Sequence, residues 1–158
     1  MDARDGGERP EEIRTDVLVL FHPEDEPAPR GRLGRLDWIL LGALSRLRAR
    51  GKFAGARGTS ALLTPDQKLK AERILVMGVG RRADLSMTAF YRLSYETART
   101  VLDLRCRQIS LDLPFRLLPH ESPEKLRHAF LEGFTAELKR GRPDGDFSVS
   151  VLSPGNGH

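Results

Sequence analysis

The sequence predicts an α/β protein, a three-layer α/β/α sandwich with a mixed, mostly parallel sheet. Segments typical of strands and of helices alternate along the chain, which is the pattern of folds that place helices on both faces of a sheet. The first strand segment, residues 16–21, is almost entirely apolar and so indicates a strand covered on both faces. With 158 residues, the chain has the length of one domain with one core.

The first half of the chain contains strands on both sides of one predicted helix. Apolar residues recur at helical spacing from Leu33 to Leu47, and Gly51 ends this single helix after several arginines. Pro65 stops a short strand, and Gly78-Val79-Gly80 follows the next one. The predicted elements are a strand at 16–21, the helix that Gly51 closes, and strands at 59–64 and 73–78.

In the second half, side chains that can cap helices define the predicted elements. Ser86 or Asp84 can accept hydrogen bonds from the first-turn amides of a helix that runs to about Leu104. Ser122, followed by Pro123 and an acid, predicts the start of a helix that Gly141 ends. The predicted strands of this half are 109–113 and 147–152.

The two ends of the chain differ in composition from the predicted domain. Residues 1–14 are rich in charge and contain Gly6-Gly7, so they cannot bury enough apolar surface to become ordered. We therefore expect a disordered tail at residues 1–14, a folded domain at 15–153 and a flexible tail at 154–158.

The composition excludes several classes of protein. No apolar run is long enough for a membrane helix, and the amino-terminal residues do not resemble a secretory signal, so we expect a cytoplasmic protein with no membrane partner. Cys106 is the only cysteine, which rules out an intrachain disulfide. We expect a buried thiol at a helix-to-strand junction; the alternative is a reactive thiol whose pKa Arg105 and Arg107 lower.

No group of residues in the sequence predicts a catalytic or metal site. The four histidines are scattered, without the spacing that brings metal ligands together. Asp144-Gly145-Asp146 lacks the further ligands of a calcium loop and predicts a turn. No nucleophile elbow is present. We therefore expect no catalytic residues, no metal and no cofactor.

Several short segments form a pattern by their order and spacing. They are Asp16 to Leu20, Gly42-Ala43-Leu44, Gly51 to Gly55 with Gly58, Arg73 to Gly80, Leu85-Ser86 and Phe130 to Gly133. Together they resemble the N-terminal domain of the leucyl aminopeptidase (cytosol aminopeptidase) family, whose fold is related to the macro domain. The resemblance covers roughly residues 15–153 and implies a macro-domain-like fold.

The resemblance implies that the chain is not an enzyme. In this family a separate C-terminal domain holds two metal ions and performs peptide hydrolysis, and no residue of this sequence matches that domain. We expect the N-terminal domain to stand alone here. The first hypothesis is a regulatory or assembly module that forms a homo-oligomer or binds a separately encoded protein through an exposed apolar patch.

A second hypothesis is a small-ligand domain, because macro domains hold ADP-ribose. Gly78, Gly80, Arg81 and Arg82 lie between a predicted strand and a predicted helix, where backbone amides and two cations could bind the phosphates of a nucleotide-like ligand. The segment departs from Gly-x-Gly-x-x-Gly and has no identifiable acidic partner for a ribose.

A third hypothesis is a DNA-binding accessory protein, because some bacterial members of the family contact DNA. Basic residues cluster at the ends of two predicted helices, and the chain has a net charge of +4. Few aromatic residues accompany them and no helix-turn-helix is visible, so solvated helix ends are favoured over a nucleic-acid site. The basic residues are Arg46, Arg48, Arg50 and Lys52 in one cluster and Lys139, Arg140 and Arg142 in the other.

Overall fold

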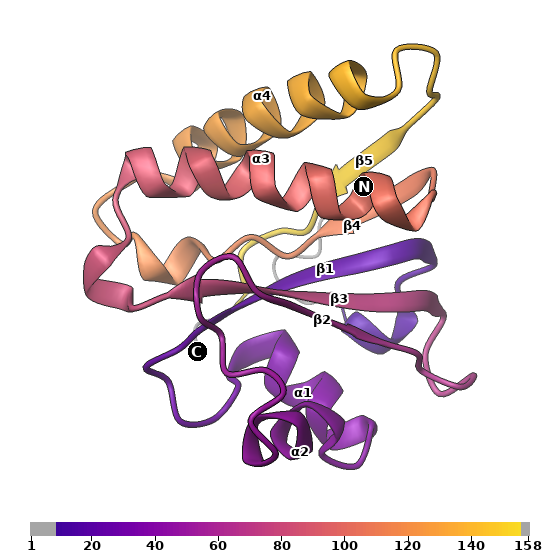
Figure 1. Cartoon of the computed structure of the whole chain (residues 1–158), viewed down its shortest axis with the longest axis vertical. Coiled ribbons are helices and arrows are strands. Elements are labelled where there is room, and N and C mark those ends of the chain that lie inside the picture. The colour runs from indigo at the N-terminus through magenta and orange to yellow at the C-terminus, as the bar shows by residue number, and fades with distance from the viewer. Residues whose placement is uncertain (1–8, 156–158) are drawn as a thin grey trace.

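Five strands form one sheet in the order β2-β3-β1-β4-β5 (Figure 1). The structure is a computed structural model and describes residues 9–155. Strand β1 lies in the centre, parallel to both β3 and β4; β5 is parallel to β4, and β2 is antiparallel to β3. This is the predicted mixed, mostly parallel sheet. The strands are β1 (Thr15–Pro23), β2 (Ser60–Leu63), β3 (Ala71–Gly80), β4 (Gln108–Leu111) and β5 (Ser148–Val151).

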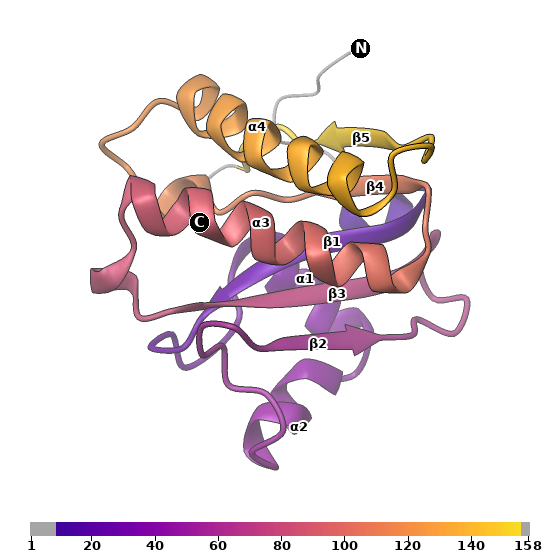
Figure 2. The ribbon, with the colours of Figure 1, turned by 45° about the horizontal axis from the view of Figure 1, so that its top comes forward.

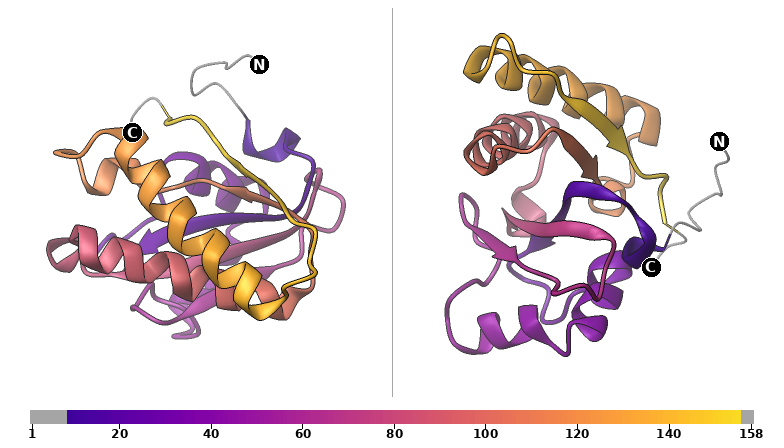
Figure 3. Two further views of the ribbon diagram at one scale, coloured as in Figure 1. Left: turned by 90° about the horizontal axis from the view of Figure 1, so that it is seen from above. Right: turned by 90° about the vertical axis from the view of Figure 1, so that its right-hand side faces the viewer.

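Helices cover both faces of the sheet, which confirms the predicted three layers. Helices α1 (Gly31–Ile39) and α2 (Ala43–Ala49) lie on one face, and α3 (Met87–Leu104) and α4 (Pro123–Gly141) on the other (Figure 1). Figure 2 shows α3 and α4 side by side across the sheet, and the right-hand view of Figure 3 shows helices above and below it.

The residues of β1 are buried because alternate side chains enter two different cores. Val17, Val19 and Phe21 pack with α3 and α4, whereas Leu18 and Leu20 pack with α1 and α2. A strand in this position needs apolar residues at successive positions, since side chains alternate between the faces. The apolar run that predicted this strand thus reflects its central place.

Two serines begin the long helices as the sequence predicts. The hydroxyl of Ser86 accepts a hydrogen bond from the amide of Ala89, and that of Ser122 accepts one from the amide of Lys125, both at 3.1 Å. These bonds use amide groups that have no partner within the first turn of a helix. Of the two predicted starting residues for α3, Ser86 is therefore the cap, and Asp84 belongs to a preceding 3-10 turn.

The single helix predicted between Leu33 and Gly51 is wrong, because the structure has two short helices there. The chain turns at Leu41 and Gly42, which have φ angles of 59° and 79°. Asp37, near the end of α1, then accepts hydrogen bonds from the backbone amides of Leu44 and Ser45 at the start of α2. The break depends on this contact, which helical spacing does not reveal.

The ordered chain begins earlier than expected. Residues 10–12, placed by the sequence in the tail 1–14, form a short 3-10 helix, and Glu11 receives hydrogen bonds of 2.6–3.0 Å from the guanidinium of Arg35. Residues 154 and 155, expected in the flexible tail, line a cavity. The remainder of both predicted tails, 1–8 and 156–158, lies outside the described residues.

Cys106 lies between α3 and β4, where it is buried, as expected. Burial raises the pKa of its thiol, although Arg73 and Arg142 oppose this effect. This direction is opposite to the lowered pKa of the alternative, in which Arg105 and Arg107 activate the thiol.

Candidate functional site

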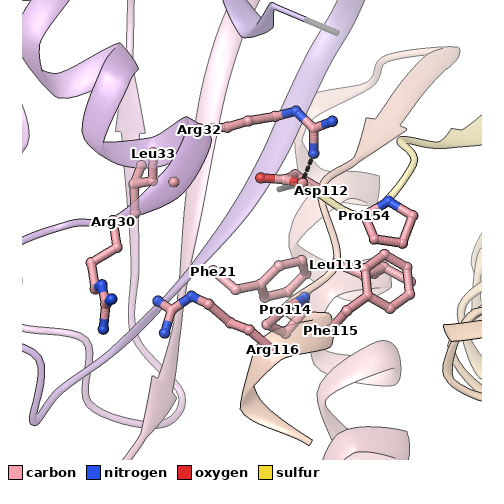
Figure 4. A pocket seen from close by; sticks show the side chains of 12 residues that line it. Phe21, Arg30, Arg32, Leu33, Asp112, Leu113, Pro114, Phe115, Arg116 and Pro154 are labelled. Atoms are coloured by element: carbon pink, nitrogen blue, oxygen red, sulfur yellow. Dashed lines mark hydrogen bonds and ion pairs between the residues drawn. The ribbon is translucent and has the colours of Figure 1, made fainter. Parts of the chain in front are cut away.

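A cavity lies where β1 and β4 end and α1 begins. Its volume is about 240 Å³. We call it the switch-point cavity, because the connections after β1 and β4 leave the sheet towards opposite faces here. Figure 4 shows it from close by. Its lining residues are Phe21, Arg30, Gly31, Arg32, Leu33, Asp112, Leu113, Pro114, Phe115, Arg116, Pro154 and Gly155.

The topology of the sheet explains why the chain leaves an opening here. After β1 the chain turns towards α1 on one face, whereas after β4 it turns towards α4 on the opposite face. Neighbouring parallel strands whose connections leave in opposite directions separate at their carboxyl ends, and open α/β sheets bind ligands in this crevice. The opening is therefore a consequence of the strand order.

An ion pair spans one wall of the switch-point cavity. The guanidinium of Arg32, in the first turn of α1, lies 2.7 Å from the carboxylate of Asp112, which directly follows β4 (Figure 4). Arg32 also donates to the carbonyl of Ser153, at 2.9 Å. Because only 8% of the Arg32 side chain is exposed, these bonds hold α1 firmly against the ends of β4 and β5.

A second charged group fixes Arg116. Both terminal nitrogens of Arg116 contact the carboxylate of Glu26, at 2.5 and 2.7 Å, and Arg82 lies 3.7 Å from the same carboxylate. Only 1% of Glu26 is exposed. Burial alone would raise the pKa of Glu26, but the hydrogen bonds and charges of the two arginines outweigh it and lower the pKa. Glu26 is therefore a carboxylate at neutral pH and holds the arginines in place.

The residues predicted to form a phosphate-binding loop lie on the other side of β1 from β4. Gly78 and Gly80 belong to β3 rather than to a loop after it, and their amides already donate to the carbonyls of Thr59 and Gly55, at 2.8 and 2.9 Å. Arg82 pairs with Asp25 and Glu26, and Arg81 is exposed. A ligand role for these four residues stays a prediction.

Close packing and backbone conformation explain why positions 78 and 80 of β3 are glycines. A Cβ atom on Gly78 would overlap the carbonyl oxygen of Ala56 and lie 2.7 Å from the hydroxyl of Thr59. Gly80 has a φ of 84°, a conformation that favours glycine. The two glycines thus let the loop 55–59 pass directly against β3.

Two large apolar side chains are exposed on the opposite side of α1 from its core contacts. Trp38 is 77% and Leu41 is 70% exposed, and both line a shallow groove between the end of α1 and the start of α2. We call these residues and the groove the Trp38 surface. The other residues of the groove are Ala28, Pro29, Gly34, Asp37, Gly42 and Ser45.

The basic cluster predicted near Gly51 is partly used inside the molecule. Arg48 donates to the carbonyls of Ala54 and Glu24, at 2.9 and 3.0 Å, and to Nε2 of the buried His22, at 3.3 Å. Arg46 donates to the carbonyl of Leu41. These two residues therefore tie α2 to the surrounding loops. In the second cluster, Arg140 lies 3.7 Å from Glu137.

Sequence reasoning missed the switch-point cavity because its lining comes from segments far apart in the chain. One signal was available: Asp112 and the residues after it directly follow a predicted parallel strand, and Arg30 and Arg32 follow the connection from another. The carboxyl ends of such strands meet at one edge of a sheet.

Among residues 9–155, no group of three or more histidine, cysteine, aspartate or glutamate residues could hold a metal ion. Within the same range, no helix has the length and apolar character needed to cross a membrane.

Comparison with known sequences gives one family. The N-terminal domain of the cytosol aminopeptidase family matches residues 17–138. A probable cytosol aminopeptidase of Cyanothece is 28% identical over 123 residues, which are 78% of this chain and 24% of that protein. One from Geobacter is 34% identical over 108 residues, covering 68% of this chain and 21% of that protein. The chain thus spans about a quarter or less of these relatives.

Solved structures show the same fold. A mutant of tomato leucine aminopeptidase has a TM-score of 0.67 and 21% identity, and the match covers all of this chain and 35% of that one. The macrodomain of Mycobacterium tuberculosis DarG has a TM-score of 0.67 and 13% identity, with 92% of this chain and 95% of that chain covered. The macro-domain-like fold is therefore confirmed.

Proposed function

Because the chain belongs to the family of the cytosol aminopeptidase N-terminal domain, we propose that it is a non-catalytic assembly module that binds a second copy of itself through the Trp38 surface. The observation that carries this proposal is the exposure of Trp38 and Leu41, at 77% and 70%. We further propose that the protein acts in the cytoplasm, a location supported by the names of its relatives, which are probable cytosol aminopeptidases.

The physical reason is the free energy of exposed apolar surface. Burying a large apolar side chain stabilises a complex by about 1.5–3 kcal/mol, and tryptophan is enriched among the residues that dominate binding energies. Leu41 is also held at a φ of 59°, a conformation unfavourable for leucine. An exposed leucine in this conformation does not stabilise a monomer, whereas burial of its side chain in an interface would stabilise a dimer.

The shape of the Trp38 surface favours a second copy as the partner. Symmetric dimers use the same patch on both protomers, so the patch must complement itself. Here the exposed indole of Trp38 forms one wall of an open groove. In a two-fold contact, Trp38 of each protomer would fill the groove of the other.

The test is the molecular mass in solution, measured by light scattering after size exclusion and by sedimentation over a range of concentrations. We expect a dimer that Trp38→Ala weakens by about 2 kcal/mol or more, which is the loss typical of a central interface residue. Leu62→Ala is the matched control, because Leu62 is also an exposed apolar residue but lies on β2. A monomeric wild type, or equal effects of the two substitutions, would contradict the proposal.

The non-catalytic part of the proposal has its own test. We expect the purified chain, supplied with zinc or manganese, to hydrolyse leucine p-nitroanilide no faster than buffer does, because hydrolysis would need side chains that hold metal ions. Metal-dependent hydrolysis that copurifies with the chain would contradict it.

A further inference from the structure

We propose that the switch-point cavity binds a compact organic anion, a carboxylate or a phosphate monoester, that carries an apolar group. This goes beyond self-association through the Trp38 surface, because the cavity has a different lining. It also differs from the nucleotide-like ligand considered for Gly78 to Arg82, both in place and in size.

The charge of the lining favours an anion. It contains three arginines, Arg30, Arg32 and Arg116, and one acidic residue, Asp112. Asp112 is matched by Arg32, and Glu26 lies between Arg116 and Arg82, so each carboxylate is already paired. Counting the side chains of residues 9–155, positive charge therefore remains at the cavity.

Arg30 is the residue best placed to bind the anion. It directly precedes α1, its side chain is exposed, and no hydrogen bond or ion pair to its side chain occurs within residues 9–155. In the view of Figure 4, its guanidinium lies on the same side of the cavity as that of Arg116. Guanidinium groups bind carboxylates and phosphates with paired hydrogen bonds.

The remainder of the lining is apolar and favours a hydrophobic group on the ligand. Figure 4 shows the rings of Phe115 and Pro154 on the side away from Arg30 and Arg116. The other apolar side chains of the lining include Phe21, Leu113 and, on the side of Arg30, Leu33. Pockets that combine an apolar wall with a few fixed polar groups are typical of sites for small molecules.

The volume limits the size of the ligand. About 240 Å³ is below the roughly 300–1,000 Å³ of pockets that hold drug-sized molecules. The ion pairs of Arg32 and Arg116 keep the walls in place without a ligand, so little ordering is needed on binding. A compact anion fits these conditions better than a dinucleotide.

The test uses phenylacetate, phenyl phosphate and the uncharged phenylacetamide as probes, and ADP as a larger anion for comparison. Binding is measured by calorimetry and by changes in the backbone amide resonances of the wild-type chain. We expect at least one anion to shift the amides of residues 30–33, 112, 113, 115 and 116, and phenylacetamide to bind at least about tenfold more weakly, because it lacks the charge. The preferred anion distinguishes a carboxylate ligand from a phosphate ester.

Variants of Arg30 complete the experiment. We expect Arg30→Gln to weaken binding by about tenfold and Arg30→Lys to retain part of it. Arg50→Gln, which removes the same charge from an exposed position after α2, should leave binding unchanged. The proposal is overturned if no probe shifts these amides, if phenylacetamide binds as well as the anions, if Arg30→Gln has no effect, or if ADP binds more tightly than both compact anions.

Discussion

The carboxylate of Asp37 in α1 accepts a hydrogen bond of 2.8 Å from the backbone amide of Leu44 in α2. The same side chain accepts hydrogen bonds from the amide and the hydroxyl of Ser45. Asp37 therefore caps α2 although it belongs to the preceding helix. It also fixes the angle between α1, which carries Trp38, and α2, with Leu41 in the turn between them.

Replacing Asp37 by alanine should lower the free energy of unfolding by about 1–2 kcal/mol, since the loss of a helix cap costs about this much. Urea denaturation followed by circular dichroism measures it. Asp37→Asn should cost less, because the amide oxygen can still accept the bond from Leu44. Equal stability of Asp37→Ala and wild type would show that the turn at Leu41 does not need this cap.

Stability should fall as the medium becomes acidic, in part because of His22. Burial lowers the pKa of His22 below its ordinary value of 6.5, and Arg48 and Arg116 lower it further, against the opposing effect of Glu26 and Asp37. The unfolded chain therefore takes up this proton at a higher pH than the folded chain. The stabilisation is complete above the ordinary pKa and is lost as the pH falls from there towards the folded pKa.

The measurement for His22 is the urea midpoint at about pH 7.5 and at about pH 5.5. His22→Gln should reduce the difference between the two midpoints, because glutamine does not titrate. His120→Gln is the matched control, since His120 is exposed. An unchanged pH dependence in His22→Gln would assign the acid sensitivity to other groups.

Gly78→Ala should destabilise the protein by about 1–3 kcal/mol, the usual cost of extra volume at a closely packed position. The added methyl group would overlap the carbonyl of Ala56 and force the loop 55–59 away from β3. Thermal unfolding checks this. Gly155→Ala, where a Cβ meets nothing within 4 Å, should leave stability unchanged to within about 0.5 kcal/mol.

A loss of stability in Gly78→Ala would show that close packing alone accounts for a glycine at position 78, with no need for a bound ligand. If the variant is instead as stable as wild type, the loop tolerates the methyl group. Packing would then not explain the glycine, and this result would favour the predicted phosphate-binding role of Gly78.

The elements that the sequence predicted best are those with local causes. Ser86 and Ser122 cap their own helices, and the apolar run in β1 follows from burial on both faces. Such features depend on residues close together in the chain, so spacing reveals them.

The features that were missed depend on contacts that the spacing of apolar residues does not record. The break between α1 and α2 follows from Leu41, Gly42 and the cap from Asp37, within a segment whose apolar spacing is that of one helix. The switch-point cavity requires the strand order, because Arg32 and Asp112 are 80 positions apart in sequence. The Trp38 surface was missed because the sequence predicts a single helix there, and in a single helix Trp38 has no turn beside it.

The central position of β1 also determines how the chain can fold as it is synthesised. Among the strands of residues 9–155, β1 is synthesised first, yet its partners are β3, which ends at Gly80, and β4, which ends at Leu111. Leu18 and Leu20 can contact α1 and α2 early, but β1 has no neighbouring strand to pair with until β3 has been made. Such distant pairings slow folding and prolong the period in which an incomplete chain can aggregate.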